Sequence, residues 1–432
     1  MLKWLTLFAI TLIQSGAFAL SIQETVQTAL ATSQQVAAAK KNLEKETLAV
    51  AEASSGYFPS VSLQIKRDKN FYAPQWRKRY ENDFYKSHLR LTIEQEMFSG
   101  GGTISKVSAA NSYASYAREN YSIRLNEIVY NIISSYQKVI SLRAIAKIND
   151  YNVLVAENLL TAVTKALEFN ADTLSNLHLL KAELSQYKGR QKNNAIQLVH
   201  AENYFEYLTN LQAPRDMTAV KHEHYCEFDS YNEFLKRVAF NNKYVKSKYH
   251  IAQYKKAQTS IAVSDIFPVV SASYNISKIS GVSDQNKKTL LERDGHYFAV
   301  NINVPLYYRG GLQYIAISKA RKDHQVSELE FKDAEARAQS EAKMVWAEYI
   351  SAKDVLKHFK ESENSYHKRY KNIKKEYDSG AQTIGSLSQA QRDFNIASIQ
   401  TIMQQMDLDM KFFNLYKMSG KLPELMLGKQ KP

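Results

Sequence analysis

A tandem duplication restricts the fold of this chain more than any other feature of its sequence. The segment YFPSVS (57–62) returns 209 positions later as IFPVVS (266–271), with the phenylalanine, the proline, the valine and the final serine in the same places. A glycine pair at 100–101 returns 210 positions later, at 310–311. Because the register slips by only one residue between these matches, the chain is predicted to contain two copies of one structural pattern.

Each copy is predicted to hold the same elements in the same order. A helical lead-in is followed by a strand, a polar loop and a second strand, and paired glycines then precede a long helical hairpin. The first copy is residues 20–213, with a lead-in over 22–55, strands over 57–68 and 87–98, and a hairpin over 103–212. The second copy is residues 230–422, with a lead-in over 230–264, strands over 266–278 and 296–308, and a hairpin over 312–419. A connection over 214–229 joins the copies, and a tail over 423–432 follows them.

The two hairpins give the strongest local signal. Between Pro74 and Pro214 there is no proline, and Gly189 is the only glycine that follows Gly102 in that interval. One short break interrupts each hairpin, EFNADT (168–173) in the first and YDSGAQT (377–383) in the second, and each break ends in a threonine that can cap the next helix. The first arm of a hairpin should therefore run for about 65 residues, or ~100 Å at 1.5 Å per residue, which is longer than a globular core needs.

The four predicted strands have the features of membrane strands. Each alternates apolar with polar residues over about 10–13 positions, the length that a tilted strand needs to cross a bilayer. Aromatic residues gather near the strand ends, as in interfacial girdles: Tyr57, Phe58, Phe267, Tyr297, Phe298, Tyr307 and Tyr308. Two half-buried soluble hairpins would show the same alternation, so that alternative stays open. Four strands cannot close a membrane barrel by themselves, whereas three chains would supply twelve strands.

The N-terminus and the composition indicate an exported protein. Residues 1–19 combine a lysine, a short apolar run and an Ala-Phe-Ala cleavage site, so they are expected to be a secretory signal peptide. No later segment has the run of about 18 apolar residues that a transmembrane helix needs. The net charge of +14 is spread along the chain, which for an exported protein argues against a nucleic-acid partner. The single cysteine, Cys226, excludes an intramolecular disulfide.

The order of these elements resembles that of the TolC-type outer-membrane efflux protein family. The resemblance rests on the two strand openings, on the strand exit VPLYYRGG (304–311) and on the hairpin turn YDSGAQTIGSLSQAQ (377–391). The first-copy exit QEMFSGGG (95–102) matches less well, with Glu96 where the second copy has Pro305. The resemblance implies a mainly α-helical fold with membrane β-strands. Three chains would share a twelve-stranded β-barrel in the outer membrane of a Gram-negative bacterium, and their duplicated hairpins would form an α-helical tunnel in the periplasm.

The resemblance also implies a function and a set of partners. A homotrimer of this kind is the passive outer-membrane channel of a tripartite efflux or type I secretion system. It receives its substrates from an inner-membrane pump of the RND, ABC or MFS type through a periplasmic adaptor protein, and its strands contact outer-membrane lipid. No cofactor and no enzymatic activity are expected. A non-transporting structural or adhesive trimer, built from the same coiled coils in the cell envelope, stays open as the alternative.

Two groups of residues are expected to position the tunnel and its adaptor. Glycine accepts backbone angles that other residues avoid, so the paired glycines are expected to be hinges between strand and helix: Gly100, Gly101, Gly310 and Gly311. The family's adaptors dock on the hairpin turns. The corresponding residues here are Phe169, Asn170, Ala171 and Thr173 in the first copy and Gly380, Ala381, Gln382 and Thr383 in the second.

A third group is expected at the periplasmic mouth. Acidic members of the family carry a pattern resembling T-I-x-D-x-x-D just after the second-copy turn, where this chain reads TIGSLSQ. Ser386 and Gln389 therefore take the acidic positions, and the first-copy neighbours Ser175 and Asn176 are also neutral. Since rings of carboxylates select cations in narrow pores, we expect this pore to be less cation-selective than those members. In the alternative, the turns themselves supply the charge, from Asp172, Asp378 or Glu376.

Two other motifs are set aside. The run Gly100–Gly102 follows a strand and opens a helix, as in phosphate-binding loops, but no Gly-Lys-Ser/Thr follows and Ser105 stands where a dinucleotide fold needs its third glycine. The connection places His222, His224 and Cys226 on one side of an extended segment, so metal binding is conceivable there. A second ligand pair at matching spacing is missing, so a solvated linker without a metal is expected.

Overall fold

The computed structural model describes residues 21–70, 84–169, 173–219, 228, 230–283, 289–306 and 310–427, so the expected signal peptide lies outside the described residues. The chain divides into two compact units. We call Met1–Lys40, Tyr121–Lys243 and Glu335–Pro432 the helical unit, and Lys41–Asn120 and Tyr244–Ala334 the sheet unit. Within the described ranges, no helix combines the length and the apolar character that crossing a membrane requires.

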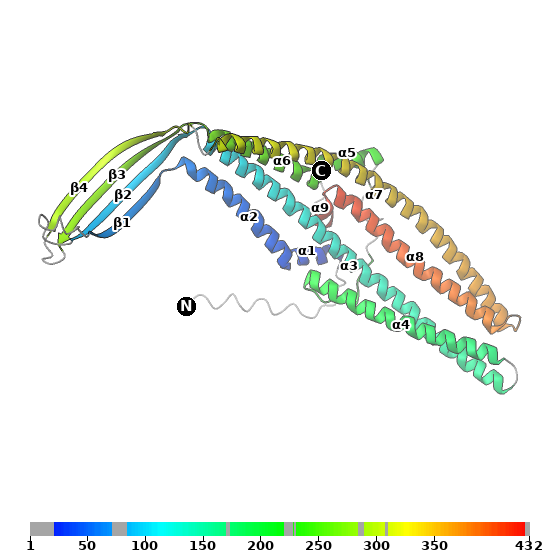
Figure 1. Cartoon of the computed structure of the whole chain (residues 1–432). Coiled ribbons are helices and arrows are strands. Elements are labelled where there is room, and N and C mark those ends of the chain that lie inside the picture. Colours follow the sequence, from blue (N-terminus) through cyan, green and yellow to red (C-terminus); the bar gives the residue numbers. More distant parts are fainter. Residues whose placement is uncertain are drawn as a thin grey trace. The chain divides into compact units, whose positions relative to one another are not determined.

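The sheet unit contains one antiparallel sheet of four strands, in the order β1-β2-β3-β4 (Figure 1). The strands are β1 (Ser60–Asn70), β2 (Phe84–Ser99), β3 (Val269–Ser283) and β4 (Thr289–Asn303). They begin and end at other residues than predicted. A short 3₁₀ turn (Ser55–Tyr57) precedes β1, and β4 stops before Pro305, which has no backbone N–H to donate to a neighbouring strand. At the loop ends, β2, β3 and β4 extend beyond the predicted bounds. Tyr307 and Tyr308 lie outside the described residues.

The sheet has one apolar and one polar face. A row across the apolar face joins Val61, Ile93, Tyr274 and Phe298. The next row, on the polar face, joins Ser62, Thr92, Asn275 and Tyr297. Ile65 and Ile302 on the apolar face are 74% and 66% exposed in the single chain. An exposed apolar face of this size needs lipid or protein against it.

The helical lead-in of each copy consists of two helices. The first copy has α1 (Ile22–Thr32) and α2 (Gln34–Ser54), and the second has α5 (Tyr231–Asn241) and α6 (Lys243–Ser264). The breaks fall at Ser33 and Asn242, which are equivalent positions of the two copies and have extended backbone angles. Serine and asparagine tolerate such breaks because they favour caps over helix interiors. Both lead-ins also start alike, on a serine whose side chain accepts a hydrogen bond from the third residue of the helix, a glutamate in each copy.

The long hairpins closely follow the prediction. The first hairpin is α3 (Gly102–Glu168) with α4 (Leu174–Thr209), and the second is α7 (Leu312–Asp378) with α8 (Ile384–Met418). Each first arm has 67 residues, or ~100 Å of helix, against a predicted length of about 65. Because all four helices contribute to the helical unit, the two hairpins pack together in that unit.

The main core of the helical unit joins residues from both copies. Large fully buried side chains come from α3 (Ile132, Tyr136), α4 (Phe205), α5 (Phe234) and α8 (Phe412, Phe413). The predicted tail also contributes, which corrects the sequence interpretation. After α8 the left-handed Gly420 reverses the chain, and a short helix, α9 (Leu422–Met426), buries Leu422 and Met426 in this core. The N–H of Gly420 bonds to the carbonyl of Lys417 and that of Lys421 to the carbonyl of Tyr416, which is the Schellman arrangement that ends a helix on glycine.

Candidate functional site

The strand-to-helix junctions lie at the paired glycines in both copies. Gly100 and Gly101 have φ values of 60° and 83°, and Gly310 and Gly311 have values of 71° and 84°. Each pair therefore has the left-handed backbone that L-residues other than glycine rarely adopt. In the first copy the pair lies between the end of β2 and the start of α3, so it sets the direction in which α3 leaves the sheet.

The two glycine pairs differ in their surroundings. A Cβ atom on Gly100 would lie 2.4 Å from Cβ of Phe267 and 2.8 Å from the backbone oxygen of Ser264. A Cβ atom on Gly310 would meet no described atom within 4 Å. Gly100 is therefore needed for close packing as well as for its backbone angle.

This difference predicts unequal effects of alanine. Gly310→Ala should cost about 1–2 kcal/mol of unfolding free energy, the strain of a left-handed alanine. Gly100→Ala should lower the unfolding free energy by about 1–3 kcal/mol more than Gly310→Ala does, because the methyl group displaces Phe267 or the backbone of Ser264. Thermal unfolding of the two variants in detergent measures both effects, and equal midpoints for Gly100→Ala and Gly310→Ala would contradict the packing argument.

The second-copy turn is built by a glycine and a threonine. Gly380 has a φ of 80°, and its N–H bonds to the carbonyl of Tyr377 at 2.9 Å, while the N–H of Ala381 bonds to the carbonyl of Glu376 at 2.7 Å. This Schellman arrangement ends α7. Thr383 then starts α8 by accepting a hydrogen bond from the N–H of Ser386 at 3.2 Å. Ala381 and Gln382 are exposed at the turn, together with Gly380.

The first-copy turn presents apolar side chains to the surface. Phe169, which follows the last residue of α3, is 81% exposed, and Leu174, the first residue of α4, is 66% exposed. Thr173 caps α4 by accepting a hydrogen bond from the N–H of Asn176 at 3.3 Å. Asn170, Ala171 and Asp172 lie outside the described residues. Leu174 was not among the predicted adaptor contacts, although it adjoins them in the sequence.

A charged network links α4 and α8 close to these turns. Glu183 on α4 has a side chain that is only 5% exposed, and Arg392 on α8 approaches its carboxylate at 2.9 Å. The hydroxyl of Ser388 donates a hydrogen bond to the same carboxylate, and Arg392 also donates to Gln389. Gln389 in turn donates to Asp393 at 2.8 Å, and Asp393 pairs with Arg369 of α7 at 2.6 Å.

Further along the hairpins, the contacts between the copies are also polar. The amide of Asn395 on α8 donates to Asn152 on α3, and that of Gln137 on α3 donates to Asp409 on α8 at 3.3 Å. The polar residues follow one stripe of α8 at alternating spacings of three and four: Ser388, Gln391, Asn395, Ser398, Gln405 and Asp409, interrupted by Ile402. By contrast, α7 and α8 pack through aromatic rings within their own hairpin, with His367 stacked on Phe394 at 4.7 Å. The polar stripe of α8 is one part of the contact between the copies, which also includes the apolar core described above.

The tyrosines near this region are neutral at physiological pH. Burial raises the pKa of Tyr370 on α7 to about 12, and the nearby Tyr151 on α3 raises it further. Burial also raises the pKa of Tyr187, one turn of α4 beyond Glu183, and the charge of Glu183 acts in the same direction while Arg392 opposes it. The charges that face each other here therefore belong to carboxylates and arginines and not to phenolates.

Comparison with known proteins points to one family. Residues 237–421, which lie in the second copy, match the model of the family described as outer membrane efflux protein. No curated protein matches the sequence.

Solved structures show that the similarity of fold extends over both copies. The Campylobacter jejuni CmeC outer membrane channel has a TM-score of 0.81 at 13% identity, over 93% of this chain and 86% of that chain. The open state of the Neisseria gonorrhoeae MtrE outer membrane channel has a TM-score of 0.78 at 15% identity, over 93% and 89%. The Vibrio cholerae outer membrane protein VceC has a TM-score of 0.71 at 15% identity, over 94% of each chain. At these identities the matches establish the fold, which combines duplicated helical hairpins with a strand pair in each copy.

The residues predicted for the periplasmic mouth have mainly local roles in the structure. The hydroxyl of Ser386 lies 3.0 Å from that of Thr383, and Gln389 belongs to the network of Arg392 and Asp393. Ser175 is exposed at the start of α4, and Asp378 is exposed at the end of α7. Sequence reasoning missed Glu183 and Arg392. The polar stripe on α8 is the sequence signal that could have indicated them. Polar residues on the side of a helix that packs against other helices need polar partners on those helices.

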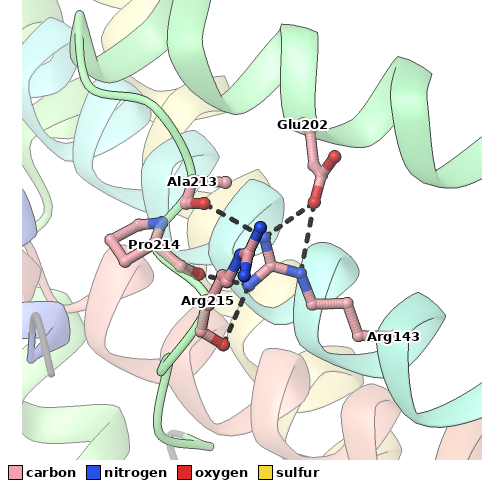
Figure 2. Close-up of polar contacts among 5 residues, drawn as sticks. All are labelled: Arg143, Glu202, Ala213, Pro214 and Arg215. Carbon is pink, nitrogen blue, oxygen red and sulfur yellow. Dashed lines mark hydrogen bonds and ion pairs between the residues drawn. The ribbon is translucent and has the colours of Figure 1, made fainter. Parts of the chain in front are cut away.

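A second arrangement that the sequence did not reveal fixes the end of the first copy (Figure 2). Arg143 on α3 pairs with Glu202 on α4 at 2.7 Å and also donates to the backbone carbonyls of Ala213, Pro214 and Arg215. Its side chain is 22% exposed. One guanidinium thus ties the start of the connection to the α3–α4 hairpin, using donors that a lysine lacks.

The histidine and cysteine segment of the connection was expected to be a solvated linker without a metal. His222, His224 and Cys226 lie outside the described residues. In the described part of the chain, no cluster of three or more His, Cys, Asp or Glu side chains could hold a metal ion.

Proposed function

We propose that three copies of this chain form a passive export duct through the outer membrane. The observation that carries the proposal is the four-stranded sheet, whose apolar face is exposed and whose outer strands, β1 and β4, each have one edge without a partner in the single chain. Open strand edges are not tolerated in lipid, and four strands are too few to close on themselves. Three chains close the sheet with twelve strands and leave a passage.

The long hairpins support the periplasmic half of this proposal. Arms of 67 residues are long enough to form a tunnel, and their turns carry exposed groups for a partner protein. We assign the adaptor contact to Phe169, Leu174 and the exposed residues Gly380–Thr383. An inner-membrane pump of the RND, ABC or MFS type delivers the substrate to this end, either for efflux or for type I secretion.

The experiment uses the purified full-length protein in detergent and in planar bilayers. We expect a trimer that dissociates on heating and that conducts ions after reconstitution. Monomers as the only species in outer-membrane extracts would contradict the shared barrel. A heat-labile trimer without conductance would support the alternative, a structural or adhesive protein of the envelope.

A further inference from the structure

The polar face of the sheet carries charges that are sorted by position along the strands. Glu96 lies near the end of β2 that meets the hinge, and Glu94 lies on the same face two residues further from the hinge. Arg90 follows beyond Thr92, which bonds to Asn275 on that face at 2.8 Å. A row further from the hinge joins Lys66, His88, Ile279 and Arg293. Acidic groups therefore lie near the hinge and basic groups near the loops.

These charges point away from the lipid. Arg90 and Arg293 share their face with Thr92 and Asn275, whereas Leu91 and Phe298 belong to the opposite, apolar face. In a membrane barrel the apolar face contacts lipid and the polar face lines the lumen. Three copies would thus place rings of three carboxylates at the hinge end of the lumen and rings of three or more cations at its outer end.

The sequence around the loops strengthens this asymmetry. Residues 66–90 and 278–294 together contain 12 Lys+Arg and 6 Asp+Glu, a net charge of +6 per chain. In the strand segments nearer the hinge, 60–64, 91–99, 269–277 and 295–303, Glu94 and Glu96 are the only charged residues apart from His296. One ion pair, Lys66 with Asp68 at 3.2 Å, offsets part of the outer charge but leaves the excess of cations.

We propose that the outer end of the lumen is an anion-attracting ring, so that the duct favours anionic over cationic solutes at its exit and conducts asymmetrically. This inference rests on the proposed trimeric duct. Charges are screened over about 8 Å at physiological salt, so cations on the wall of a narrow lumen act on a passing ion. Walls of low dielectric constant focus the field of such a ring into the passage. Solutes reach this ring last on their way out, and for them it acts as the final electrostatic filter.

The test is the reversal potential of the reconstituted full-length trimer in a KCl gradient. The wild type should prefer chloride, and its current should differ between the two polarities. Arg90→Gln with Arg293→Gln should lower the chloride-to-potassium permeability ratio by about twofold or more, because six cations leave the lumen wall of a trimer. Glu94→Gln should raise the ratio.

A control residue lies at nearly the same position along the strands as Arg90, but on the apolar face of the sheet. Lys278 is the strand neighbour of Leu89, next to Arg90, but it belongs to the apolar face and pairs with Asp294 at 4.0 Å. Lys278→Gln removes one positive charge per chain, as Arg90→Gln alone does, and should leave the permeability ratio unchanged. An unchanged ratio in the Arg90 and Arg293 variant, or an equal change in Lys278→Gln, would overturn the proposal. Absence of conductance in every variant, the wild type included, would instead refute the duct itself.

Discussion

Arg392→Met should open the periplasmic end of the reconstituted duct and raise its conductance several-fold. The reason is that the substitution leaves the buried carboxylate of Glu183 without a positive charge beside it. Glu183 is 5% exposed and has Arg392 as its charge partner across the α4–α8 contact. Removing one member of a buried ion pair typically costs about 3–5 kcal/mol, because the other charge stays without compensation. The least costly response is for α8 to move away from α4 and let water reach Glu183.

A double variant separates this cause from a general loss of packing. Glu183→Gln removes the buried charge, and the amide can still accept the hydrogen bond from Ser388. Arg392→Met combined with Glu183→Gln should therefore return the conductance close to that of the wild type. If the double variant conducts as much as Arg392→Met alone, the uncompensated charge is not the cause.

The neighbouring ion pair supplies a control of matched chemistry. Arg369 and Asp393 join α7 to α8 within one hairpin, and the Arg369 side chain is 46% exposed. An ion pair this exposed contributes at most about 1 kcal/mol, and Asp393 keeps its bond from Gln389 when Arg369 is replaced. Arg369→Met should therefore leave the conductance of the duct near the wild-type value.

The repeated parts of the fold were predictable because duplication turns weak local signals into strong ones. A Phe-Pro pair before a strand means little once, but its return at Phe267 and Pro268 supports both copies. Strand bounds were harder to predict. The alternation of apolar and polar residues continues beyond the strands, and only the hydrogen-bonded pairing with a neighbouring strand decides where a strand ends. Pro305 shows this point, since it looked like part of the last strand and instead follows it.

The missed features all depend on contacts between distant segments. Glu183 and Ser388 are separated by 205 positions, so the polar stripe of α8 can indicate that Ser388 has a polar partner but not that the partner is Glu183. Arg143 binds three backbone carbonyls, which any sequence provides, so its role can be seen only in the folded chain. The short α9 was taken for a tail, because its five residues are too few to form a periodic pattern, although Leu422, Pro423, Leu425 and Met426 are buried.

Ser386→Asp should make the periplasmic mouth cation-selective. The position of Ser386 in its helix indicates that the substitution will not disturb the fold. Ser386 is the third residue of α8, and Thr383 is the cap. A carboxylate at this position is stabilised by the helix dipole and by the free N–H groups of the first turn. Folding and trimer assembly should therefore be preserved. Gln389→Asp would be a poorer test, since it places a second carboxylate one turn from Asp393.

The expected change follows from the charge that a trimer gains. Ser386→Asp adds three carboxylates around the mouth, and rings of carboxylates favour cations in narrow passages. The potassium-to-chloride permeability ratio, measured from reversal potentials, should rise about twofold or more above the wild type. The competing explanation is that Asp378, exposed at the end of α7, already supplies the negative charge of the mouth. In that case the wild type would prefer cations, Asp378→Asn would abolish the preference, and Ser386→Asp would add little to it.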